Sequence, residues 1–438
     1  MKPKMLGGSR VGVLTPWRIV KYMHMKYIIL PALFLGFTSC TFQNKERIPE
    51  NLEGLQNLVV IQKSSSPESS IKFSRDLVID DSDATGSWYH STSGGFAFGG
   101  SDFFAGLEVD DTGKIFVGDN YEKVIHVFDS TGKYLKKLGS EGRGPGEFEG
   151  VYDIKIQSDQ LFAFDYFQFR TTFFSLDSLD LIEVRNVYTN RTPDREELRG
   201  WSSRPVSLIS DDLLIVSYKS EMKNANYGTE HYNLDQELLV RYYVVDREGK
   251  IRSEMIDELR DMKNITADVD GKHLFNLSPV PFLQQPMISI SNEGYIYTAN
   301  SEEPLVKMHN ENGDYIKAFY IPMEKKSIDR DELIKLFAQD DEENTNLLLH
   351  AELPEKWPAL SRIITDDENN LWISTITANE SLQEWLIIDD AGKLIATFSW
   401  PENRTIEKIK NGYVYARETQ ESTGLQSIIK YRFELEEI

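Results

Sequence analysis

An all-β protein built from repeated antiparallel sheets is the fold class that three features of the sequence predict. A tight turn between two apolar segments recurs, and its clearest copies read LEVDDTGKIFVGDN and ISISNEGYIYTAN. Each copy continues into a second strand that closes on another turn, and the two turn glycines are 19 residues apart in both, Gly113 to Gly132 and Gly294 to Gly313. Aromatic residues make up 11% of the chain, which suits half-buried sheet surfaces.

The repeated phrase fits the chain six times, each time followed by a second β-rich run. Gly, Asn and Asp dominate the turn because they tolerate the positive φ of a tight hairpin. Period-2 alternation on either side gives strands with one inner and one outer face. Four antiparallel strands per unit, repeated six times, predict a six-bladed β-propeller. The turn positions are Gly113, Asp159, Asp211, Gly294, Asn369 and Asn411.

Both ends of the propeller, which we expect to span residues 55–438, should meet in the sixth blade. That blade ends near the C-terminus with little room for a fourth strand. The N-terminal run Ile71 to Ile79 is the best candidate to complete it, and this pairing would close the ring and remove exposed sheet edges.

A helical insertion is predicted at about residues 327–352, between the fourth and fifth blades. Asp329 can cap a helix with Glu332 three residues on, and Leu333 and Phe337 follow at helical spacing. We expect this insertion to pack on the rim of a blade.

The N-terminal 40 residues form a leader that resembles a bacterial lipoprotein signal. Lys26 precedes an apolar run over residues 27–37 that is too short to span a bilayer as a helix but suits a signal peptide. Thr38 and Ser39 supply the small pair before Cys40, although Phe37 replaces the usual aliphatic residue. Cys40 is therefore the predicted lipidation site.

The leader places the protein in the cell envelope. Met23 and Met25 are alternative starts, and residues 41–54 read as a flexible polar tether. Acyl chains on Cys40 would anchor the chain to a membrane, with the outer membrane expected, without spanning it. Periplasmic and surface orientations both stay open, and we expect a monomer or a subunit of an envelope complex.

Composition argues against nucleic acid and gives no support to catalysis. The 70 acidic and 48 basic residues leave a formal charge of −22, which repels a phosphate backbone. Neither a GxSxG elbow nor an HExxH helix occurs in the sequence. The histidines fall at unrelated offsets in the repeat, with His126 and His309 on strands away from the axis, so we expect no zinc site.

The segment GSEGRGPGEFEG, Gly139 to Gly150, follows a strand that ends FDSTGKYLKKL. This arrangement resembles the exported six-bladed β-propeller proteins typical of Bacteroidetes, which are related to NHL-repeat propellers. The resemblance implies a lipid-anchored or secreted propeller, and metal-dependent NHL-type lyases are its enzymatic precedent.

The glycines of this segment invite comparison with a phosphate-binding loop. Such a loop needs a following helix and usually a Lys-Ser or Lys-Thr pair, and neither is present. We expect a blade-crossing loop in which Arg143 pairs with a carboxylate such as Glu147. The loop residues are Gly142, Arg143, Gly144, Pro145 and Gly146.

A candidate ligand-binding mouth comes from polar residues six positions after the shared turn. Asp119, Asp165 and Asn300, joined by Tyr166, could hold Ca²⁺ or sugar hydroxyls. The alternative is that these side chains bind their own turns, as Asx motifs do, and we favour it. No cofactor is expected, with Ca²⁺ the open alternative.

The function that these features favour is a non-catalytic binding or scaffold module for a protein or glycan partner. The competing hypothesis is a hydrolase or lyase with a divalent cation in the central channel. It requires several acidic or amide side chains to converge at the axis, whereas a binding module does not.

Overall fold

The computed structural model describes residues 48–62, 66–79, 104–157, 159–186, 195–210, 212–220, 237–262, 264–275, 280–338, 341–377, 382–420 and 426–438. The leader, the start positions Met23 and Met25, and the lipidation site Cys40 lie outside the described residues. The described residues all belong to one compact unit.

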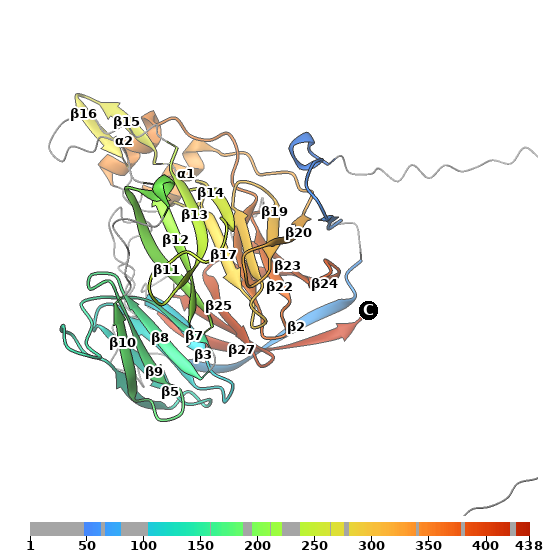
Figure 1. The fold of residues 1–438 in the computed structure, drawn as a ribbon. Coiled ribbons are helices and arrows are strands. Elements are labelled where there is room, and N and C mark those ends of the chain that lie inside the picture. Colours follow the sequence, from blue (N-terminus) through green and yellow to red (C-terminus); the bar gives the residue numbers. More distant parts are fainter. Residues whose placement is uncertain are drawn as a thin grey trace, which may run out of the picture. The chain divides into compact units, whose positions relative to one another are not determined.

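Six blades, each with four antiparallel strands, confirm the predicted β-propeller, and β1 (Leu58–Val60) adds a fifth strand to the fourth blade (Figure 1). The first blade holds β3 (Phe104–Val109), β4 (Ile115–Asp119), β5 (Val124–Phe128) and β6 (Tyr134–Leu138). The second holds β7 (Val151–Gln157), β8 (Gln160–Asp165), β9 (Arg170–Ser175) and β10 (Leu181–Asn186). The third holds β11 (Trp201–Ser210), β12 (Leu213–Ser220), β13 (Leu239–Asp246) and β14 (Asp257–Arg260).

The remaining blades follow the same order. The fourth holds β17 (Pro286–Ile290), β18 (Ile296–Asn300), β19 (Leu305–His309) and β20 (Tyr315–Tyr320). The fifth holds β21 (Leu360–Thr365), β22 (Leu371–Thr375), β23 (Leu382–Ile388) and β24 (Leu394–Pro401). The sixth holds β25 (Arg404–Lys410), β26 (Tyr413–Thr419), β27 (Gln426–Glu437) and the N-terminal strand β2 (Ser69–Ile79).

The first strand of every blade lies innermost. Residues from β3, β7, β11, β17, β21 and β25 together line one cavity of about 240 Å³, which is the central channel. β-Bulges interrupt five of these six inner strands, and a bulge bends the strand and redirects its extra residue. The extra residue is Tyr152 in β7 and Glu407 in β25.

The predicted closure of the ring is confirmed. β2 pairs antiparallel with β27 from Ser69 opposite Glu437 to Ile79 opposite Ile428, and Figure 1 shows the two strands side by side. Ile79 is buried in a cluster that also contains Leu107 of the first blade and Tyr415 of the sixth. The closing strand therefore joins two blades through its hydrogen bonds and its side chains.

Residues 48–54, the described part of the expected tether, pack against the propeller. A 3₁₀ helix spans Glu50–Leu52, and Leu52 is buried against Leu305 and Tyr320 of the fourth blade. The strand β1 (Leu58–Val60) then adds in parallel to β20. Apolar burial of Leu52 explains the difference, and the compact unit starts at Ile48.

The predicted insertion holds two helices, α1 (Arg330–Phe337) and α2 (Glu342–His350). The Asp329 carboxylate accepts the Asp331 N–H at 2.9 Å, as expected of an N-cap. The sequence did not predict the hairpin of β15 (Thr266–Val269) and β16 (Lys272–Phe275), which packs with the helices around Phe337 and Trp357. None of the described helices is long and apolar enough to cross a membrane.

Shortening Ile79 tests whether the closing strand stabilises the ring. Ile79→Ala removes methyl groups from a residue that is 1% exposed, so we expect the free energy of unfolding to fall by about 2–4 kcal/mol. Lys72→Ala, on an exposed part of the same strand, should change it by less than about 0.5 kcal/mol. Urea unfolding followed by tryptophan fluorescence measures both, and equal effects would contradict the role of Ile79.

Candidate ligand-binding site

Asp119, Asp165 and Asn300 lie where the repeat places them, each at the end of the second strand of its blade. The Asp119 carboxylate accepts the N–H groups of Tyr121 at 2.8 Å and Glu122 at 2.9 Å. Burial raises its pKa, but the His126 hydrogen bond and these N–H groups lower it more, so the pKa of Asp119 lies below its usual range.

Asp165 and Asn300 also bind their own turns. One Asp165 oxygen accepts the N–H groups of Phe167 and Gln168, each at 3.0 Å. Asn300 accepts the Glu302 N–H at 3.0 Å and donates to the Arg260 carbonyl at 2.8 Å. These contacts match the alternative that we favoured, and Ca²⁺ binding at this mouth stays a prediction.

Tyr166 differs from its three predicted companions because it is exposed within a cluster of aromatic rings. The Tyr166 ring centroid lies 5.1 Å from that of Tyr152 and 5.5 Å from that of Phe169. Phe167 lies 5.9 Å from Tyr152 and 6.0 Å from Tyr166. We call Tyr152, Tyr166, Phe167 and Phe169 the aromatic cluster.

The aromatic cluster is unusual because its rings face solvent. The exposed fractions are 38% for Tyr152, 43% for Tyr166, 56% for Phe167 and 45% for Phe169. Contiguous exposed apolar surface on a folded protein marks binding sites. The guanidinium of Arg204, from the third blade, lies 5.9 Å from the Tyr152 ring.

Local backbone geometry holds the aromatic cluster in place. Tyr152 is the extra residue of the β7 bulge, and Phe169 has a φ of +48°, which a bulky side chain adopts only under constraint. Gly150 leaves the space that Phe167 fills, because a Cβ there would lie 2.8 Å from the ring. The bulge in β7 and the constrained turn between β8 and β9 thus hold the four rings close together.

The loop of Gly142, Arg143, Gly144, Pro145 and Gly146 supports this turn. The loop lies between β6 and β7, as expected for a blade crossing. Gln168 donates to the Gly142 carbonyl at 3.0 Å, and Arg170 donates to the carbonyls of Arg143 at 2.9 Å and Gly144 at 2.7 Å.

The partner of Arg143 differs from the one expected. Arg143 pairs with Glu149, with the Nε to Oε1 distance at 2.5 Å. Glu147 instead accepts the Gly144 N–H at 2.6 Å, which occupies its carboxylate. The sequence could not distinguish the two acids because both lie within reach of the flexible arginine.

The central channel is lined by paired charges. Lys408 lies 2.7 Å from Glu108, and Lys155 lies 3.7 Å from the other Glu108 oxygen. Glu407 likewise lies between Arg362 at 3.2 Å and Arg417 at 2.9 Å. Both channel carboxylates are thus balanced by cations, which differs from the acidic or amide ring that a divalent cation requires.

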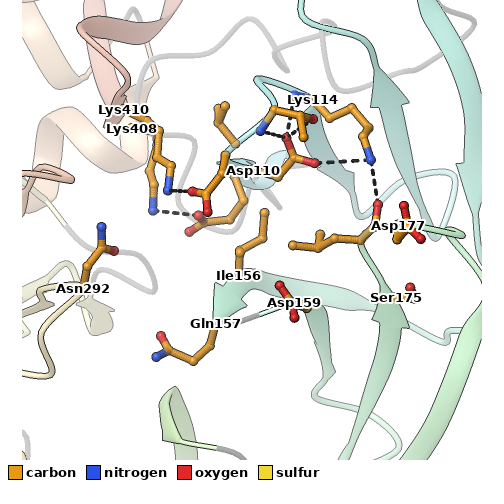
Figure 2. Close-up of a pocket in the computed structure, with 15 residues that line it drawn as sticks. Asp110, Lys114, Ile156, Gln157, Asp159, Ser175, Asp177, Asn292, Lys408 and Lys410 are labelled. Carbon is orange, nitrogen blue, oxygen red and sulfur yellow. Dashed lines mark hydrogen bonds and ion pairs between the residues drawn. The ribbon is translucent and has the colours of Figure 1, made fainter.

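A cavity of about 570 Å³ opens at the mouth of the channel formed by the turns after the inner strands (Figure 2). Lys410 pairs with Asp111 at 2.6 Å, and Lys114 donates to the Leu176 carbonyl at 2.6 Å. Gln157, at the far end of β7 from Tyr152, lines this mouth. The aromatic cluster therefore belongs to the opposite face of the propeller.

The fold and these surfaces define a six-bladed β-propeller without a recognisable catalytic constellation among the described residues. Residues 106–276 match the model of the family DUF5128, described as a 6-bladed beta-propeller, and this match confirms the predicted resemblance over less than half of the chain. No curated protein matches the sequence.

Solved structures are similar to this chain at low sequence identity. A protein described as exported, from Bacteroides fragilis, is 12% identical, with a TM-score of 0.44 over 86% of this chain and 99% of its own. A DUF4221 family member from Bacteroides vulgatus is 11% identical, with a TM-score of 0.48 over 85% and 100%. Virginiamycin B lyase from Staphylococcus aureus is 11% identical, with a TM-score of 0.37 over 83% and 99%.

The pairing of Glu407 in the channel should be visible in the pH dependence of stability. Burial raises the pKa of Glu407, but Arg362 and Arg417 lower it more, so it lies below its usual range. A carboxyl whose pKa is lower in the folded than in the unfolded protein stabilises the fold above its pKa in the unfolded chain, which is about 4.3 for Glu. This stabilisation is lost as the pH falls through the pKa of the carboxyl in the folded protein.

Glu407→Gln should therefore destabilise the protein by roughly 3 kcal/mol at pH 7, and the difference from wild type should shrink on acidification below about pH 4. Urea unfolding at a series of pH values measures it. Glu434→Gln, on an exposed ion pair, serves as the control. A difference that stayed constant with pH would show that charge is not the cause.

Proposed function

We propose that this protein is a non-catalytic binding module of the cell envelope that holds a neutral carbohydrate on its aromatic cluster. The observation that carries the proposal is the set of four exposed rings fixed on one face of the propeller. Tyrosine and phenylalanine offer rigid contact area at little loss of conformational entropy, which suits the stacking of sugar rings.

The surroundings of the aromatic cluster favour a glycan over other ligands. Arg204 lies beside the cluster and offers a guanidinium for sugar hydroxyls. The chain carries a formal charge of −22, so an acidic polysaccharide would be repelled at low ionic strength. A neutral polysaccharide meets both conditions.

The enzyme hypothesis has less support. It needs unpaired acidic or amide groups at the axis, and Glu108 and Glu407 are each already placed between two cations. The propeller serves on this proposal as a rigid support for loops, with the chemistry of recognition in the loops.

Replacing two rings of the aromatic cluster tests carbohydrate binding. Tyr166→Ala combined with Phe167→Ala should weaken binding about 30-fold, from the loss of roughly 1 kcal/mol of stacking per ring. Affinity electrophoresis on soluble xylan, mannan, β-glucan and starch measures the change. Phe275→Ala removes a ring that is 37% exposed on β16, away from the cluster, and should bind as wild type does.

Two outcomes would contradict the glycan proposal. The first is that the wild-type protein binds none of the polysaccharides. The second is that the double variant binds them as well as the wild-type protein does. Capture of a protein by wild type but not by the double variant would assign the aromatic cluster to a protein partner instead.

Lipid anchoring at Cys40 is a separate part of the proposal and has its own test. Cys40→Ser should leave the fold intact and move the protein from the membrane pellet to the soluble fraction of a bacterium that processes lipoproteins. Metabolic labelling with a fatty-acid analogue should lose its signal in parallel. Label retained by the variant would show that another residue carries the lipid.

A further inference from the structure

Asp119, Glu122 and His126 come together in the hairpin of β4 and β5 in the first blade. One ligand atom from each lies within 4.8 Å of the other two, and Asp119 Oδ2 is 3.3 Å from His126 Nε2. Asp119 and His126 are fully buried, whereas the Glu122 side chain is 26% exposed. Two carboxylates and one imidazole thus face each other at the edge of the protein interior.

Hydrogen bonds among the described residues satisfy this group only in part, with His126 Nε2 hydrogen-bonded to Asp119 Oδ2 at 3.3 Å. Glu122 Oε2 and His126 Nδ1 are shielded from solvent and have no hydrogen-bond partner there. Lys137 Nζ lies 3.7 Å from Glu122 Oε2, which is too long for a hydrogen bond. A buried carboxylate oxygen without a donor is costly, and a cation bound beside Glu122 would satisfy it.

In the second blade the carboxylate of the equivalent turn finds its hydrogen-bond donor within the protein, without a bound cation. The equivalents of Asp119, Glu122 and His126 there are Asp165, Gln168 and Thr172. The Gln168 amide donates to Asp165 Oδ2 at 2.8 Å, so the carboxylate has its donor. In the first blade His126 Nε2 takes the place of that donor, 3.3 Å from Asp119 Oδ2. Glu122 cannot donate when ionised, and its Oε2 atom is left without a hydrogen-bond partner among the described residues.

The fourth blade differs at two of the three positions. Asn300, Glu303 and Lys307 stand in the equivalent places, and the Lys307 ammonium lies 2.7 Å from Asp257. A fixed side-chain cation and a neutral amide therefore replace the imidazole and the carboxylate. Among these three blades the combination of Asp, Glu and His belongs to the first.

We propose that Asp119, Glu122 and His126 form a site for a first-row divalent transition-metal ion, with Zn²⁺ as the best fit. Zinc bonds of about 2.0–2.1 Å at tetrahedral angles place two ligand atoms about 3.3 Å apart, which is the separation of Asp119 Oδ2 and His126 Nε2. The partly exposed Glu122 side chain can rotate to supply the third ligand, and water completes the shell.

This site is independent of the glycan proposal and does not lie on the channel axis. The imidazole favours Zn²⁺ over Ca²⁺ or Mg²⁺, which prefer oxygen alone. The prediction from sequence that the histidines make no zinc site is thereby revised for His126. Its approach to Asp119 depends on the pairing of β4 with β5, which places His126 opposite Val117.

Zinc titration of the chelator-stripped full chain tests the proposal. We expect one equivalent to bind with saturation and to raise the thermal midpoint, since the ion binds the folded state. Co²⁺ should give the visible absorption of a four-coordinate site. Mg²⁺ should neither compete nor stabilise.

Variants separate this site from adventitious binding. Glu122→Gln, on a partly exposed side chain, should fold and weaken zinc affinity by about tenfold or more, and His126→Gln should weaken it further. Glu303→Gln, at the equivalent exposed position of the fourth blade, should leave affinity unchanged. Absence of saturable binding, or equal affinity for wild type and Glu122→Gln, would overturn the proposal.

Discussion

Pairing of β2 with β27 is the constraint on which the rest of the structure depends. It joins Ile79 to Ile428, residues separated by most of the chain, and it completes the sixth blade beside the first. A ring of blades without this pair would leave an edge strand open at β27. Because the two ends must meet before the interface forms, loop-closure entropy opposes the last step of folding.

The repeat in the sequence predicted most of the fold because its turns obey a simple steric rule. Gly113, Gly294, Asn369 and Asn411 all adopt a positive φ, between 56° and 84°. The β15 and β16 hairpin escaped prediction because its four-residue strands fall outside the repeat and are stabilised by tertiary contacts with the inserted helices. The burial of Leu52 was not predicted for the same reason, because it depends on packing against the fourth blade.

The candidate sites were harder to predict, because they depend on register and on local irregularities. Tyr166 could be found by its position in the repeat, but its neighbour Tyr152 is exposed by a bulge that no periodic pattern specifies. His126 meets Asp119 only because β4 and β5 pair as they do. The ion pairs of the channel could not be predicted from sequence. Glu108 belongs to the first blade and Lys408 to the sixth, and the two residues meet only because the ring is closed.

The N-terminal segment bears on how the propeller would respond to mechanical load. Residues before β2 attach to the fourth blade through β1, and Glu68 pairs with Lys393 of the turn before β24 in the fifth blade. If the proposed lipid at Cys40 holds the chain, a pulling force meets the packing of Leu52 and β1 before it meets the Glu68 contact. These attachments precede the pairing of β2 with β27 along the chain, so a force on the N-terminal side loads them before it loads the ring closure.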